Sequence, residues 1–149
     1  MNKLIGKFIN TNDRVLDLGC GDGSLLAFLK ENNQAKGLGL EIDHQKIQKC
    51  LQKDVSVIDQ DIDSGLSNFQ DQSFDAVIMS QSIQALRKPE VALEEIIRIG
   101  KEAIISIPNF ANWRCRLQLI FGGTMPVSSA LPHDWYSTCL LYTSDAADD

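Results

Sequence analysis

The chain has 149 residues, 44% of them hydrophobic and 23% charged, which is enough for one hydrophobic core but not for two comfortable domains. Its formal net charge is −6, and the basic residues are scattered along the chain. A phosphate backbone is recognised by a concentrated positive field, so we expect no nucleic-acid partner.

The first predicted elements form a helix–turn–strand–turn–helix unit. Apolar residues at helical spacing predict a short amphipathic helix from Leu4, Ile5, Phe8 and Ile9. Turn-forming residues follow at 10–13, and an apolar run at 14–18 that ends in glycines predicts a strand. In the helix expected next, Leu25, Leu26 and Leu29 share one face.

The same alternation continues along the chain. Strands are expected at 36–41, 55–59, 74–79 and 103–107, with helices near 45–52 and 90–99 and a further helix over 113–121. Strands that alternate with helices predict an α/β fold with a parallel sheet, because each crossover helix returns the chain to the same edge.

The helix near 90–99 carries the clearest boundary signals. Pro89 suits its first position, Glu90 favours its positive end, and Gly100 can close it. Glu94 and Arg98 are spaced to pair one turn apart. Its apolar face is expected to be core, and consists of Val91, Ile96, Ile97 and Ile99, with Leu93 nearby.

The cysteines and the N-terminus indicate a reducing compartment. Cys20, Cys50, Cys115 and Cys139 form no CxxC pair, so we expect reduced thiols and neither a zinc site nor a redox dithiol. Residues 1–10 lack the features of a secretory signal, and no segment approaches the roughly 18 apolar residues of a membrane helix. We therefore expect a cytoplasmic protein without a membrane partner.

A glycine-rich turn follows the first predicted strand. Gly19, Gly21 and Gly23 allow the backbone to approach a ligand closely, because side chains there would block contact and forbid the turn. A dinucleotide fingerprint reads GxGxxG, but this turn reads GxGxG and has Ser24 in place of the third glycine. The spacing therefore argues against a pyrophosphate ligand. A nicotinamide-dependent oxidoreductase remains only as a third hypothesis.

Carboxylates around this turn predict a ligand with positive charge. Asp17 precedes the glycines and Asp22 lies among them, so a diphosphate would be repelled and an ammonium group attracted. S-adenosylmethionine carries a sulfonium and an amino group. We assign Asp17 to the amino group or to ordering the loop, while Asp22 has the alternative of a solvated turn residue. Cys20, between the first two glycines, is included among the cofactor-binding residues.

Glu41 closes the second predicted strand, about 20 residues beyond the glycines. An acidic side chain there can accept hydrogen bonds from both ribose hydroxyls, and Ile42 would then press on adenine. The alternative is that Glu41 and Asp43 simply cap the next helix. The glycine turn favours the ligand interpretation.

A third acidic position follows the third predicted strand. The Asp61 carboxylate can accept from the adenine amino group, and the Ile62 N–H can donate to a ring nitrogen. Asp59 and Asp63 compete for this role but fit the spacing less well. Asp17, Glu41 and Asp61 thus follow three successive strands and predict one convergent site.

Substrate should approach beside the fourth predicted strand, at the switch point of the sheet, where Ser80 lies. Gln81 and Gln84 are candidate hydrogen-bonding residues there, or else satisfy loop backbone. The sequence lacks an Asn-Pro-Pro-aromatic motif and a Pro-Cys nucleophile, which disfavours methylation of nucleic-acid bases. His44 and His133 have no matching metal ligands, so surface or packing roles are expected and no metal site is predicted.

These motifs together resemble the class I S-adenosylmethionine-dependent methyltransferases. Within that class, residues 16–23 (LDLGCGDG), 80–85 (SQSIQA), 105–114 (ISIPNFANWR) and 125–127 (MPV) are similar to the methionine biosynthesis protein MetW family. The resemblance implies a Rossmann-like, doubly wound, mostly parallel sheet and S-adenosylmethionine as cofactor. It also implies a role in methionine synthesis, in support of a homoserine O-acyltransferase. An ordinary methyltransferase with a small-molecule acceptor is the alternative.

The family resemblance stops near Thr138. We expect residues 1–138 to form the S-adenosylmethionine-binding domain, truncated before its C-terminal strands. Residues 139–149 resemble translated sequencing adapter and are expected to be non-native. Missing strands would leave a sheet edge uncovered, so the fragment as written is expected to be unstable or prone to aggregation.

Overall fold

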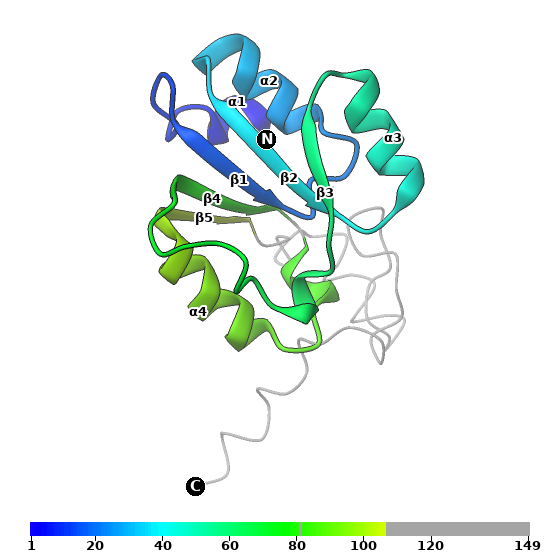
Figure 1. Ribbon diagram of the computed structural model, residues 1–149. Coiled ribbons are helices and arrows are strands. Elements are labelled where there is room, and N and C mark those ends of the chain that lie inside the picture. Colours follow the sequence, from blue (N-terminus) through cyan, green and yellow to red (C-terminus); the bar gives the residue numbers. More distant parts are fainter. Residues whose placement is uncertain (81, 107–149) are drawn as a thin grey trace, which may run out of the picture.

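The computed structural model describes residues 1–80 and 82–106, which form a parallel sheet with helices on both sides (Figure 1). The strands are β1 (Arg14–Leu18), β2 (Lys36–Glu41), β3 (Ser56–Asp59), β4 (Phe74–Ser80) and β5 (Gly100–Ser106). The helices are α1 (Asn2–Ile5), α2 (Ser24–Asn33), α3 (His44–Gln52) and α4 (Pro89–Ile99), with short 3-10 turns η1 (Ile62–Ser64) and η2 (Ile83–Ala85).

The five strands lie in the order β3-β2-β1-β4-β5, and every neighbouring pair is parallel. The chain first builds outward from β1 to β3 and then crosses to β4 on the other side of β1. Leu18 at the end of β1 aligns with Leu40 of β2 and Met79 of β4. This arrangement confirms the doubly wound α/β fold and puts its switch point between β1 and β4.

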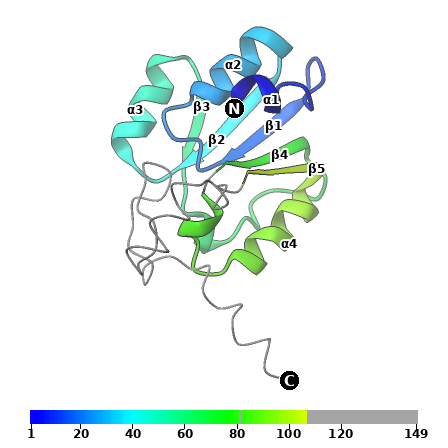
Figure 2. The same ribbon diagram turned by 180° about the vertical axis from the view of Figure 1, so that it is seen from behind.

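Each face of the sheet carries its own hydrophobic core (Figures 1 and 2). Helices α1, α2 and α3 cover one face, and α4 covers the other. On the first face, the expected Leu25, Leu26 and Leu29 of α2 are buried together with Val15 and Ile78 of the sheet. Each such side chain stabilises the fold by about 1.5–3 kcal/mol through removal of apolar surface from water.

Helix α4 begins at Pro89 as predicted, but its buried face is narrower than expected. Its buried residues are Ala92, Ile96 and Ile99, which are spaced four and three apart and form one stripe. Val91 and Ile97, which we expected in the core, are 44% and 72% exposed. Both residues flank the stripe, so the apolar residues of this helix predict a wider buried face than the structure has.

The predicted pair Glu94–Arg98 is also wrong. Arg98 pairs instead with Glu95 one residue closer and with Asp71, and it donates to the Leu66 and Phe69 carbonyls. The guanidinium therefore ties α4 to the loop that precedes β4. Its five donors allow this several-way bridge.

Gly100 closes α4 as predicted, but without a left-handed turn. It has extended backbone angles and begins β5, so this strand starts three residues before the predicted 103–107. A Cβ atom at this position would lie 2.6 Å from Val77 Cγ2 of β4. The glycine is therefore required by close approach to the neighbouring strand.

The N-terminal helix is shorter than predicted. Helix α1 ends at Ile5, although Ile5 and Ile9 are both buried as expected, while Leu4 and Phe8 are exposed. Within the described part of the chain, no helix has the length and hydropathy needed to cross a membrane. Several predictions fall outside the described residues: the helix over 113–121, the residues Cys115, His133 and Cys139, and the tail 139–149.

Candidate functional site

The glycine turn connects β1 to α2 at the carboxyl edge of the sheet. Gly19, Gly21 and Gly23 have φ values of 76°, 59° and 72°, a region that side chains disfavour. The N–H groups of Gly19 and Cys20 both donate to the Leu40 carbonyl of β2, at 2.9 and 3.0 Å. The predicted turn is therefore present and is anchored to the neighbouring strand.

Glu41 at the end of β2 holds this turn from the side. One carboxylate oxygen accepts from Gly21 N–H at 2.9 Å, and the other accepts from the N–H groups of Ile42 and Asp43 at 3.0 and 3.2 Å. Asp43 caps α3, since its carboxylate accepts from Gln45 N–H at 2.9 Å. The structure thus separates the two residues: Asp43 is a helix cap, and Glu41 faces the glycine turn.

Asp17 is the most unusual acidic group of this edge. Its side chain is only 2% exposed, and its Oδ1 has no hydrogen-bond partner among the described residues. Burial, together with the negative charge of Glu41, raises the pKa of Asp17 to about 7. A buried acceptor without a donor, next to a second carboxylate, suits a ligand that brings positive charge.

Asp22 serves the turn itself. Its carboxylate accepts from the backbone N–H and the hydroxyl of Ser24, and it lies 2.5 Å from Lys53 Nζ. The hydrogen bond from Lys53 is the main reason that the pKa of Asp22 falls to about 2. Because Lys53 balances this charge at the surface, Asp22 matches the alternative of a solvated turn residue.

Asp61 lies two residues beyond β3, at the same carboxyl edge. Its Oδ1 accepts from Asp63 N–H at 2.9 Å and caps η1, while Ile62 is half-buried against the α4 side of the core. Its two competitors contact other groups: Asp59 lies 3.6 Å from His44 Nδ1, and Asp63 accepts from Arg87 N–H at 3.0 Å. The adenine role of Asp61 and Ile62 stays a prediction.

The remaining predicted residues occupy the same edge in different ways. Ser80 ends β4, with its hydroxyl 3.5 Å from Met1 Sδ, and Ile42 is largely exposed beside Glu41. Ser82, two residues beyond β4, donates its hydroxyl to the Leu18 carbonyl at 2.8 Å. Gln81 and the side chain of Gln84 lie outside the described residues.

The Cys20 side chain turns away from the predicted ligand. Its sulfur is buried 3.8 Å from Cys50 Sγ of α3, and both thiols are free, as expected. A Cβ atom on Gly39 of β2 would collide with this sulfur. Only the backbone of Cys20 can therefore belong to the ligand side of the turn.

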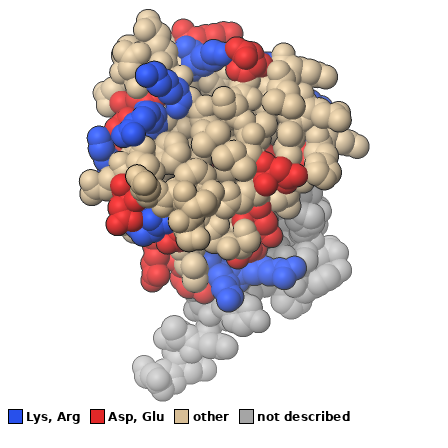
Figure 3. All heavy atoms as spheres, viewed as in Figure 1, with Lys and Arg blue, Asp and Glu red and all other residues tan. Residues whose placement is uncertain are grey.

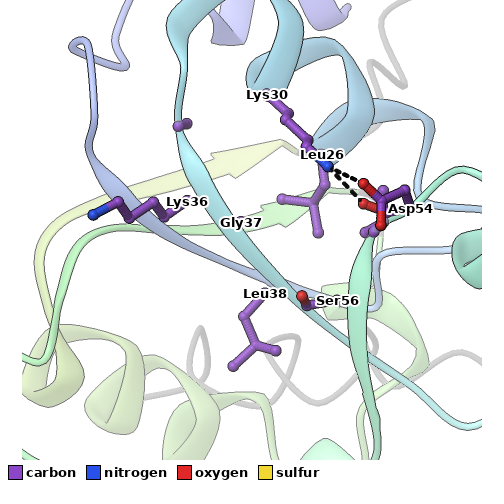
Figure 4. A pocket seen from close by; sticks show the side chains of 9 residues that line it. Leu26, Lys30, Lys36, Gly37, Leu38, Asp54 and Ser56 are labelled. Carbon is purple, nitrogen blue, oxygen red and sulfur yellow. Dashed lines mark hydrogen bonds and ion pairs between the residues drawn. The ribbon is translucent and has the colours of Figure 1, made fainter.

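A separate cavity lies at the other end of the strands. It has a volume of about 370 Å³ and is lined by Leu26 and by the start of β2 and β3, with the Lys30–Asp54 ion pair at its side (Figure 4). These are the amino ends of the strands, whereas the glycine turn and Glu41 follow carboxyl ends. Ligands of open α/β sheets bind outside the carboxyl ends, so we do not assign this cavity to the cofactor.

Figure 3 shows how charge is distributed on one face of the described residues. On the face shown in Figure 3, basic and acidic side chains are interspersed around a broad neutral area. The expectation that nucleic acid is not a partner stays a prediction.

Comparisons with solved structures give the same fold. A methyltransferase described as dependent on S-adenosylmethionine, from Archaeoglobus fulgidus, is 23% identical with a TM-score of 0.65, over 87% of this chain and 64% of its own. A chain of a complex that includes the Haloferax volcanii Trm112 methyltransferase activator is 32% identical with a TM-score of 0.57, over 62% of this chain and 42% of its own. The sheet is that of class I S-adenosylmethionine-dependent methyltransferases.

Comparisons of sequence identify the family. The bifunctional methionine biosynthesis protein MetXA/MetW of Rhodopirellula baltica is 33% identical over 141 residues. The alignment covers 89% of this chain but only 23% of that protein, so the chain spans about a quarter of this relative. The family model for methionine biosynthesis protein MetW matches residues 2–148. The chain therefore belongs to the MetW family, a methyltransferase-like family associated with methionine biosynthesis.

Proposed function

We propose that this chain binds S-adenosylmethionine at the carboxyl edge of β1, β2 and β3. The observation that carries the proposal is Asp17, a buried carboxylate whose Oδ1 lacks a partner among the described residues, beside Glu41 and the glycine turn. Two close carboxylates in a poorly solvated place repel each other. A ligand with an ammonium and a sulfonium group would relieve that repulsion.

We propose roles for the other predicted residues that their positions allow. Glu41 would accept from a ribose hydroxyl, since a carboxylate offers about four acceptor sites and backbone N–H groups occupy three of them here. Ile42, exposed beside it, would contact adenine, with Asp61 and Ile62 at the far side of the base. Ser80 would face the methyl-bearing end of the ligand.

We further propose that the protein supports a homoserine O-acyltransferase. The support comes from the Rhodopirellula baltica relative, whose name joins MetXA with MetW in one chain. A domain that binds a late metabolite of a pathway can regulate an early enzyme, provided that ligand binding and partner binding favour the same state. Such coupling requires no methyl transfer.

Calorimetry with S-adenosylmethionine and S-adenosylhomocysteine tests the first proposal, with NAD as the matched comparison. We expect saturable binding of both adenosyl ligands and none of NAD. Glu41→Gln should weaken binding at least tenfold, because a charge-assisted hydrogen bond to ribose is lost. Saturable binding of NAD, without binding of either adenosyl ligand, would overturn the proposal.

The second proposal is tested by capture of the tagged full-length protein from its own cells. We expect an acyltransferase to be recovered and its activity to change when the adenosyl ligand is added. Methyl transfer to a small-molecule acceptor, without any recovered acyltransferase, would sink the regulatory role. That outcome would establish the alternative of an ordinary methyltransferase.

A further inference from the structure

The C-terminal end of α3 packs against the glycine turn. Cys50 is the one residue of this helix that is buried. Its thiol donates to the Gly21 carbonyl at 3.2 Å. The N–H of the same glycine donates to Glu41. Both sides of the Gly21 residue are therefore held, one by a carboxylate of β2 and the other by a thiol of α3.

Cys50 also leaves no room for a side chain at Gly23, the last glycine of the turn. A Cβ atom on Gly23 would lie 3.0 Å from Cys50 Sγ and 3.3 Å from Cys50 Cα. Side chain and backbone at the end of α3 thus pack directly against the start of α2. This close approach is possible because position 23 lacks a side chain.

Lys53, one residue beyond α3, gives a third contact. Its Nζ lies 2.5 Å from the Asp22 carboxylate and 2.6 Å from the Ser24 hydroxyl. The contacts from α3 and its cap therefore reach four consecutive residues, 21–24.

We infer that Cys50 is a positioning residue for the cofactor turn, holding it in its binding shape before the ligand arrives. This inference rests on the proposed binding of S-adenosylmethionine. Three glycines at positive φ make the turn intrinsically adaptable, so its order must come from outside contacts. Preorganised backbone binds more tightly because less ordering remains to be done on association.

Three variants separate positioning from simple packing. Cys50→Ala removes the donor, Cys50→Ser retains a donor, and Val55→Ala is the control. Val55 is buried in the same core cluster and its N–H bonds the Cys50 carbonyl, but it lines the cavity at the opposite end of the strands. All three should lower thermal stability, so circular dichroism must first show that each is folded at the assay temperature.

The measurement is the dissociation constant of S-adenosylhomocysteine by calorimetry. We expect Cys50→Ala to weaken binding about three- to tenfold, the range for loss of one hydrogen bond. Cys50→Ser should recover to within about twofold of the wild type, and Val55→Ala should leave the constant unchanged. Unchanged affinity in Cys50→Ala, or equal weakening in Val55→Ala, would overturn the inference.

Amide hydrogen exchange of the ligand-free protein keeps this inference separate from the proposed function. Cys50→Ala should accelerate exchange at Gly21 and Gly23 about tenfold relative to Val55→Ala. If the wild type binds no adenosyl ligand, the proposed function and the effect on affinity both fail. The exchange rates still test whether Cys50 holds the turn. Equal rates in Cys50→Ala and Val55→Ala would refute this positioning role.

Discussion

Replacement of Asp17 by asparagine should change how the stability of the ligand-free protein depends on pH. Burial and the charge of Glu41 raise the pKa of Asp17 from 3.8 to about 7. The folded chain therefore binds more protons than the unfolded chain between these pH values. Its free energy of unfolding must fall as the pH rises from about 4 to about 7, and this contribution is level above pH 7.

The magnitude follows from the two pKa values. A change from 3.8 to about 7 corresponds to about 4 kcal/mol of stability lost across this window. Asparagine has nearly the same shape but does not ionise. Its buried amide also needs partners, which adds a constant of about 1–3 kcal/mol that is the same at every pH. The pH dependence therefore isolates the charge of Asp17.

Urea unfolding at pH 5 and pH 8 measures this effect. Between pH 5 and pH 8 the free energy of unfolding of the wild type should fall by about 3 kcal/mol more than that of Asp17→Asn, because only the two pH units below the folded pKa contribute. Glu41→Gln should reduce the loss, because Glu41 is the second cause of the raised pKa. Parallel stability profiles of the wild type and Asp17→Asn would refute the argument that Asp17 is a buried, strained carboxylate.

Other substitutions test single contacts of the fold and the site. At pH 5, where Asp17 is protonated and does not repel Glu41, Glu41→Gln should lower the free energy of unfolding by about 1–3 kcal/mol in urea titrations, because one backbone N–H loses its acceptor. Gly39→Ala should cost about 1–3 kcal/mol through collision with the Cys20 side chain, and adding Cys20→Ala should restore part of that loss in a double-mutant cycle. Gly100→Ala should lower the midpoint of thermal unfolding, since its Cβ would press on Val77.

Local sequence pattern predicted the elements that position the site. Residues 14–18 and 36–41 are strands with the predicted boundaries, and the glycines between them have the positive φ values that their residue type favours. The resemblance to class I methyltransferases and the MetW family is confirmed by the comparisons. These signals are local, because strand periodicity and glycine conformation depend on neighbouring residues.

Contacts between distant segments could not be predicted in the same way. Cys50 and Lys53 meet the glycine turn some 30 residues away in sequence, and no spacing rule marks such a contact. One signal existed: cysteine is often buried, and Cys50 lies in a helix whose other residues are mostly polar. The exposure of Ile97 was missed for a similar reason, since the pattern marks apolar residues but does not fix which neighbour covers them.

Nuclear magnetic resonance of the labelled protein, titrated with S-adenosylhomocysteine, tests the central claim most directly. We predict saturable shifts of the backbone amides of Gly19, Gly21, Gly23 and Glu41, at the carboxyl edge of the sheet. Amides beside the cavity at the amino ends, such as Gly37 and Ser56, should not move. Shifts confined to that cavity, or no shifts at millimolar ligand, would contradict the account.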